Sequence, residues 1–99
     1  MTTVVIDSPA LRDYLGPDGP WAKDAGALVR KYRMGFKLSE TQLAAMVGVT
    51  AQAIRSIEAG KIVPRDYLRA AIAYSLGQNL SDIWPPLNRT HVGEIATVL

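Results

Sequence analysis

The fold of this chain is decided by residues 38–61, which read LSETQLAAMVGVTAQAIRSIEAGK. Apolar residues recur there at three- and four-residue steps, which predicts two short helices over 40–47 and 51–59. Only three residues separate the two helices, and the first of them is Gly48. A corner this tight favours glycine, because glycine adopts a positive φ at little cost. The stretch therefore predicts two helices held at a fixed angle.

Each helix of this pair has its own start signal. Ser39 is followed three residues later by Gln42, which is the spacing of a capping box, and Thr50 is a typical N-cap residue. Ala44 supplies the small side chain needed where the helices cross. The apolar side chains expected to face inward are Leu43, Val47, Val49, Ile54 and Ile57.

Outside this stretch, stop and start signals predict four further helices. They are expected over 9–15, 21–34, 65–76 and 80–84. We expect an all-α domain of five helices over 21–85, preceded by an N-terminal arm (1–20) that carries the short first helix. A C-terminal tail (86–99) follows it. The β-branched ends, 2–6 and 94–99, are expected to form small strands.

Length and composition restrict the class of protein. Ninety-nine residues suit one small domain, and the absence of cysteine excludes disulfides, thiol catalysis and cysteine-based zinc sites. No signal peptide and no membrane-length apolar run is present, so we expect a cytoplasmic protein without membrane contact. Residues 22–69 hold nine basic and four acidic side chains. This excess fits either a polyanion partner or an ordinary solvated surface.

Catalytic signals are missing from the sequence. No glycine-rich phosphate loop follows a predicted strand, no pair of histidines has metal-ligand spacing, and no nucleophile is paired with a base. The one histidine, His91, has no ligand-type neighbours. We expect no enzyme activity, no cofactor, no metal and no small-molecule ligand.

The run over 38–61, continued by Pro64-Arg65, Leu76-Gly77 and the stretch from Asn79 to Trp84, resembles the lambda-repressor/Cro-type helix-turn-helix of the XRE family. The resemblance covers roughly residues 25–84. It implies a lambda-repressor-like five-helix fold that binds double-stranded DNA, with the helix 51–59 lying in the major groove.

The resemblance also implies roles for individual residues. Gln52 is the best base reader, because its amide can pair bidentately with adenine, and Arg55 is expected to reach a guanine or a phosphate. The expected base-reading set is Ala51, Gln52, Arg55 and Ser56. The expected DNA-backbone set is Ser39, Gln42, Thr50, Lys61 and Arg65. Arg33 and Glu58 match a structural ion pair of the family and are not expected to touch DNA.

Two positions depart from the family pattern. Lys37 stands where many members have glycine, which leaves the end of the preceding helix undefined. Glu40 replaces a common glutamine whose amide contacts DNA, and a carboxylate near phosphates is unfavourable unless it turns away.

The function expected from these residues is sequence-specific binding of operator DNA by a homodimeric phage or bacterial transcription regulator, with repression as the expected role. Candidate dimer surfaces are the apolar residues near Trp84 and Leu87, and the β-branched ends. Two alternatives remain open. One is an antitoxin that uses the same module to bind both DNA and a toxin protein, and the other is an interaction module that has lost DNA binding.

Overall fold

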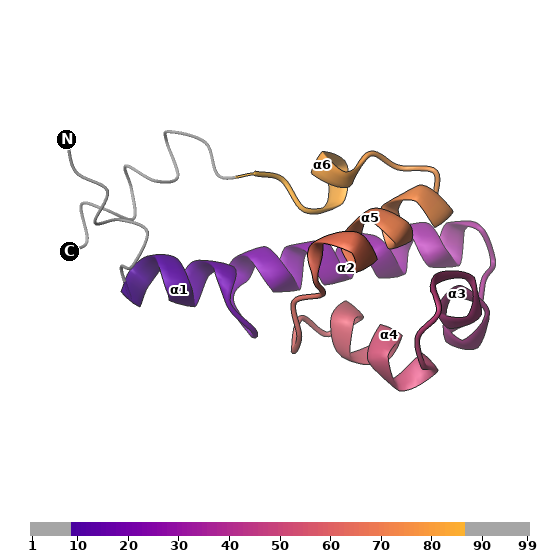
Figure 1. Ribbon diagram of the computed structural model, residues 1–99, viewed down its shortest axis with the longest axis horizontal. Helices are drawn as coiled ribbons and strands as arrows, with labels where there is room; N and C mark the ends of the chain where they lie inside the picture. The colour runs from indigo at the N-terminus through magenta and orange to yellow at the C-terminus, as the bar shows by residue number, and fades with distance from the viewer. Residues whose placement is uncertain (1–8, 87–99) are drawn as a thin grey trace.

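The structure, a computed structural model, describes residues 9–86. Those residues form six helices and no strand (Figure 1). The helices are α1 (Pro9–Leu15), α2 (Pro20–Gly35), α3 (Glu40–Val47), α4 (Ala51–Glu58), α5 (Asp66–Ser75) and α6 (Leu80–Ile83). The all-α fold with a lambda-repressor-like arrangement of α2–α6 is confirmed. The strands expected at 2–6 and 94–99 fall outside the described residues, as does His91.

Helix α2 is the longest element and forms the spine of the molecule (Figure 1). Gly19 is its N-cap and Pro20 its first residue. The expected range, 21–34, is one residue short at each end. At the start, proline fits because the first helical position needs no intrahelical N–H and suits the fixed φ of proline. Helix α5 is shorter at each end than expected, since Arg65 and Leu76 serve as its caps.

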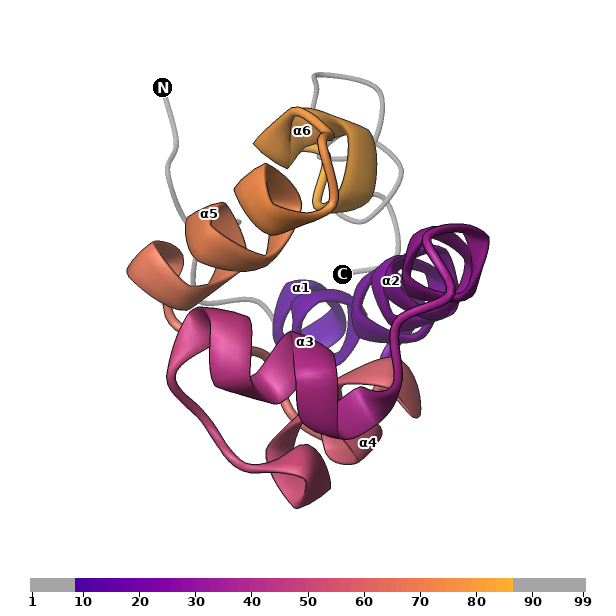
Figure 2. The same ribbon diagram turned by 90° about the vertical axis from the view of Figure 1, so that its right-hand side faces the viewer.

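The core lies between α2 and the remaining helices of the domain (Figure 2). Its largest fully buried side chains come from all five helices α2–α6, and each is less than 2% exposed. They are Val29, Leu43, Ile54, Ile57, Ile72, Leu76 and Ile83. Inward positions predicted for α3 and α4 (Leu43, Ala44, Ile54, Ile57) are buried, while Val47 and Val49 are half-buried. The apolar periodicity therefore identified most of the core.

Helices α2 and α4 approach each other closely at Gly26. A Cβ at this position would lie 2.6 Å from the carbonyl oxygen of Glu58 and would also meet the carbonyl oxygen of Ile57. In the sequence Gly26 appears only as an unfavourable residue inside a helix. The structure shows that its missing side chain lets the first half of α2 pack against the end of α4.

The N-terminal segment contacts the domain at two places. Leu11 of α1 is only 7% exposed, and the amide of Asp18 donates a 2.7 Å hydrogen bond to the carbonyl oxygen of Gly60. Helix α1 lies at the N-terminal end of α2, roughly along its line (Figure 1). The described part of the arm is thus packed onto the five-helix domain, and the boundary at residue 20 remains a prediction.

Candidate nucleic-acid interface

Helices α3 and α4 meet in a three-residue corner that local interactions define. Gly48 ends α3 in the left-handed region at φ 77°, and the amide of Val49 donates to the carbonyl oxygen of Ala44 at 3.0 Å. The Thr50 hydroxyl then accepts from the amide of Ala53 at 3.1 Å and starts α4. Glycine is favoured here because a Cβ would add strain to this backbone conformation. These bonds fix where α4 begins.

The start of α3 carries a complete capping box. Ser39 Oγ accepts from the Gln42 amide at 3.0 Å, and Gln42 Oε1 accepts from the Ser39 amide at 2.7 Å. Both side chains are exposed, and the capping box uses the oxygen of the Gln42 amide group. These two residues of the expected backbone set are therefore caps in the free protein.

Helix α4 has one buried side and one exposed side. Ile54 and Ile57 are at most 1% exposed and hold the helix against the core. Gln52 and Arg55 project from the opposite side and are exposed, as three- and four-residue spacing dictates. The other two residues of the expected base-reading set, Ala51 and Ser56, are partly buried beside them. The structure thus brings all four to one side of a single helix.

Arg55 links α4 to the start of α3. Its Nε donates to Glu40 Oε1 at 3.2 Å, and its Nη1 donates to Gln52 Oε1 at 2.6 Å. The Arg55 side chain keeps 54% of its surface exposed, and that of Glu40 keeps 32%. The sequence identified Glu40 as a departure from the family pattern, but not as the partner of Arg55, because the two lie fifteen positions apart.

A second ion pair, between Arg33 and Glu58, is largely buried. Arg33 of α2 donates to both carboxylate oxygens of Glu58, at 2.6 and 3.0 Å, and to the carbonyl oxygen of Leu38 at 2.8 Å. The hydrogen bond with Glu58 raises the pKa of Arg33 above its usual value, although desolvation opposes the rise. The pair fastens α2 to α4 and to the start of α3, so its charges serve the fold.

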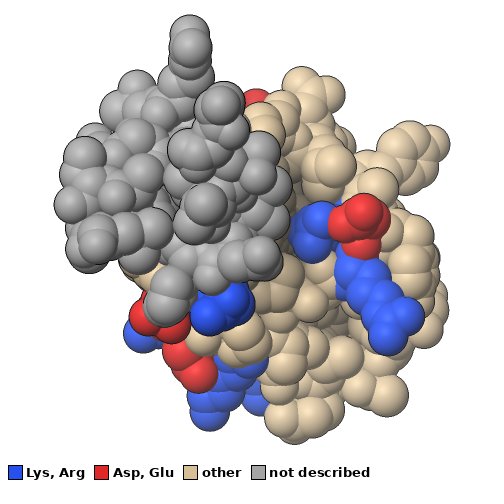
Figure 3. Space-filling model, turned by 60° about the vertical axis from the view of Figure 1, so that its left-hand side comes forward, with Lys and Arg blue, Asp and Glu red and all other residues tan. Residues whose placement is uncertain are grey.

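The remaining expected DNA contacts lie after α4. Lys61 and Arg65 are both exposed, one in the loop and one at the N-cap of α5. Positive charge does not cover every side of the molecule, and on the face in Figure 3 basic side chains lie in separate groups with acidic ones beside them. On that face the basic side chains therefore form no continuous patch.

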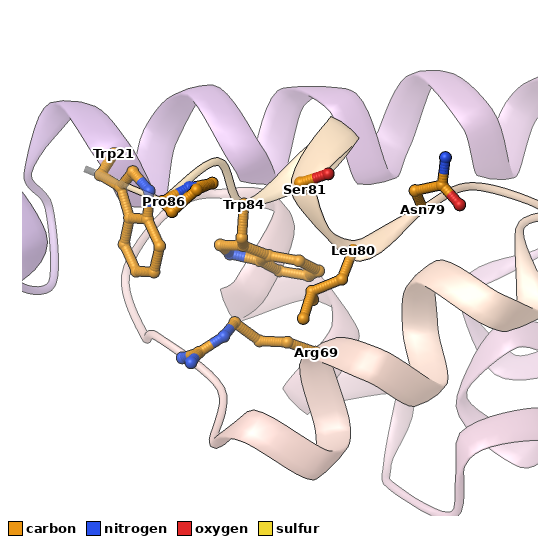
Figure 4. Close-up of a pocket in the computed structure, with 7 residues that line it drawn as sticks. All are labelled: Trp21, Arg69, Asn79, Leu80, Ser81, Trp84 and Pro86. Atoms are coloured by element: carbon orange, nitrogen blue, oxygen red, sulfur yellow. The ribbon is translucent and has the colours of Figure 1, made fainter. Parts of the chain in front are cut away.

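A separate slot of about 590 Å³ lies between α2, α5 and α6 (Figure 4). It is lined by Trp21, Arg69, Asn79, Leu80, Ser81, Trp84 and Pro86. Trp21 Nε1 donates to the carbonyl oxygen of Pro85 at 2.8 Å, and the Arg69 guanidinium lies 5.5 Å from the Trp21 ring centroid. Arg69 Nη1 donates to the carbonyl oxygen of Pro64 and Nη2 to Asp66, so both terminal nitrogens already have partners.

Trp84 itself is buried, and the dimer surface expected among the apolar residues near it stays a prediction. Its side chain is only 4% exposed because it closes the core between α2 and α5, and the exposed apolar residue nearby is Leu80. Leu87 and the β-branched ends lie outside the described residues.

Within residues 9–86, no helix is long and apolar enough to cross a membrane. The same residues contain no group of three or more potential metal-ligating side chains.

Comparison with known proteins agrees with this geometry. Residues 29–70 match a family model described as helix-turn-helix. Curated proteins give no match. Among solved structures, the clp gene regulator ClgR from Corynebacterium glutamicum has a TM-score of 0.62 at 20% identity, and the match covers 83% of each chain. Hydroxypropylphosphonic acid epoxidase from S. wedmorenis has a TM-score of 0.61 at 22% identity.

The epoxidase match covers 68% of this chain and 36% of the epoxidase, so this chain spans about a third of that enzyme's length. At these identities both likenesses show a common fold. The family match and the α3–α4 corner agree with this fold. Residues 29–70 form a helix-turn-helix domain of the XRE, or Cro/lambda-repressor, type.

Proposed function

We propose that this protein is a sequence-specific transcription regulator that reads operator half-sites with α4 and acts as a repressor. The observation that carries the proposal is the exposed side of α4, where Gln52 and Arg55 project opposite the buried Ile54 and Ile57. A helix fixed by its own cap and core can present such side chains to the edges of base pairs in the major groove. The fold shared with the regulator ClgR supports the same role.

Phosphate contacts would hold α4 in register on the duplex. Lys61 and Arg65 are exposed cations beyond the end of α4, and the Gln42 amide group is exposed at the start of α3. Together with the Ser39 and Thr50 caps, they form the expected backbone set. Such contacts supply affinity without sequence preference, whereas side chains on α4 supply discrimination.

The proposal extends to assembly and location. Two copies would bind half-sites about one helical turn apart, because a single α4 covers too few base pairs to define an operator. We infer a cytoplasmic regulator that uses no cofactor and catalyses no reaction. Sedimentation of the full chain with one half-site and with two half-sites measures the stoichiometry, and a single copy on a complete operator would contradict the homodimer.

Substitution of Gln52 tests the base-reading role. Gln52→Ala should reduce the preference for operator over random DNA by about 1–3 kcal/mol, because it removes a bidentate contact to one base. The measurement is a competition titration at fixed salt, on an operator selected from random DNA by the wild type. Equal weakening on both DNAs would show that Gln52 does not read a base.

Substitution of Lys61 tests the phosphate role. Lys61→Ala should weaken binding to operator and random DNA alike. It should also reduce the magnitude of the negative slope of log K against log salt by about one unit. Lys31→Ala is the matched control, since Lys31 is an exposed lysine on α2 beside Tyr32. If both variants keep the wild-type slope, Lys61 makes no phosphate contact.

A further inference from the structure

The row formed by Glu40, Arg55 and Gln52 leaves the Arg55 guanidinium both restrained and accessible. Hydrogen bonds hold it at two atoms, Nε and Nη1, yet about half of the side chain faces solvent. An arginine has five N–H donors, and these two bonds use one donor each. Three donors therefore remain, on the adjacent nitrogens Nη1 and Nη2.

Two donors on adjacent nitrogens match one base edge in the major groove. Guanine presents two acceptors there, O6 and N7, which an arginine can engage bidentately. The Gln52 oxygen that accepts from Arg55 keeps a second lone pair, and its Nε2 group keeps both donors. Gln52 therefore remains able to pair with a neighbouring base while it holds Arg55.

The ion pair with Arg55 explains why position 40 can carry a carboxylate. Alone on a surface that meets phosphates, it would repel DNA, but its ion pair with Arg55 offsets that charge. A long arginine loses rotamer freedom when it binds, and a tether in the free protein removes part of that loss beforehand. Glu40 also stands close to Arg33, whose charge it helps to stabilise. The carboxylate is thus balanced by cations from two helices.

We propose that Glu40 is a positioning residue that aims Arg55 at a guanine in each half-site. Glu40 itself touches no base, and Arg55 makes the contact with Gln52 holding its other side. This inference rests on the proposed function, because it requires α4 to lie in the major groove. It adds to that function a specific base preference, namely a G·C pair that Arg55 reads.

Selection of bound sequences from random DNA tests this proposal with the full chain and three variants. The wild type should enrich a guanine at one position of each half-site. Arg55→Lys keeps the charge but lacks the planar fork, so it should lose that preference alone. Glu40→Gln should reduce the same guanine preference at least about threefold, with other positions unchanged. Asp24→Asn removes an exposed carboxylate from α2 and should leave every position unchanged.

A spectroscopic measurement reports the tether without DNA. The Nε–H resonance of Arg55 in the free, ¹⁵N-labelled protein should be protected from exchange in the wild type and in Asp24→Asn. That protection should decrease in Glu40→Gln, because the neutral amide oxygen accepts a weaker hydrogen bond than the carboxylate does. Thermal unfolding of each variant shows whether the fold is intact.

Two outcomes would overturn the proposal, and a third would overturn the function beneath it. Unchanged guanine preference in Glu40→Gln would show that Glu40 does not position Arg55. Equal weakening of all sequences by Arg55→Lys would make Arg55 a phosphate contact. A wild type that enriches no motif would instead overturn the proposed function on which the inference rests.

Discussion

At the scale of single residues, Lys37 shows how the chain tolerates a departure from its family pattern. It adopts φ 58°, the left-handed conformation that glycine takes without strain. Two hydrogen bonds fix it there, from the Lys37 amide to the carbonyl oxygen of Met34 and from the Leu38 amide to that of Arg33. Helix α2 therefore ends where a glycine would end it, at a cost in backbone strain.

Replacing Lys37 by glycine should therefore stabilise the protein. Lys37→Gly is expected to raise the free energy of unfolding by about 1 kcal/mol, because it relieves the left-handed strain. Lys37→Ala is the control, since it removes the same charge and keeps the strain. Urea denaturation of the two variants measures the difference, and equal stabilities would mean that position 37 is unstrained.

At the scale of elements, two glycines of α2 have opposite roles. Gly26 lies against the backbone of α4, whereas a Cβ at Gly35 would meet nothing within 4 Å. Helix propensity alone treats both as weak points that alanine would improve. The packing of α2 on α4 reverses that expectation at Gly26 only.

Alanine substitutions at these two glycines test the α2–α4 contact. Gly26→Ala should destabilise the fold by about 1–3 kcal/mol, because the new Cβ must displace backbone carbonyl groups of α4. Gly35→Ala should change stability by no more than about 1 kcal/mol, and in the stabilising direction. Chemical denaturation checks both, and a Gly26→Ala protein as stable as wild type would contradict the close approach.

The boundaries of the helices could be predicted well from the sequence. Ser39, Thr50 and Gly48 act locally, so their capping and turn preferences could be identified without knowing what α3 and α4 pack against. Errors stayed within one residue, at both ends of α2 and α5 and at the C-terminal ends of α4 and α6. Differences of this size are expected, because helix ends fray and their last turns are irregular.

At the scale of the whole molecule, the described part of the N-terminal arm packs onto the domain. Leu11 is nearly buried on α1, and the backbone bond from Asp18 to Gly60 joins the following loop to the end of α4. This arrangement favours one cooperative unit that includes α1, whereas the sequence placed the boundary after residue 20.

Truncation of Leu11 measures whether α1 belongs to that unit. Leu11→Ala should lower the free energy of global unfolding by about 2 kcal/mol, near the low end for a buried leucine, because one side of it borders an open cavity. Asp13→Ala, at an exposed position on the same helix, should change it by less than about 0.5 kcal/mol. If Leu11→Ala left global unfolding unchanged, α1 would be an independent appendage.

The sequence by itself determined the helices, the corner between α3 and α4, and most of the buried side chains, because periodicity, caps and glycine preferences operate over a few neighbouring residues. Tertiary structure alone decided which distant residues meet. It placed Glu40 beside Arg55, Gly26 against the end of α4 and Trp84 in the core. Such contacts depend on how helices cross in space, and spacing along one chain does not specify those distances.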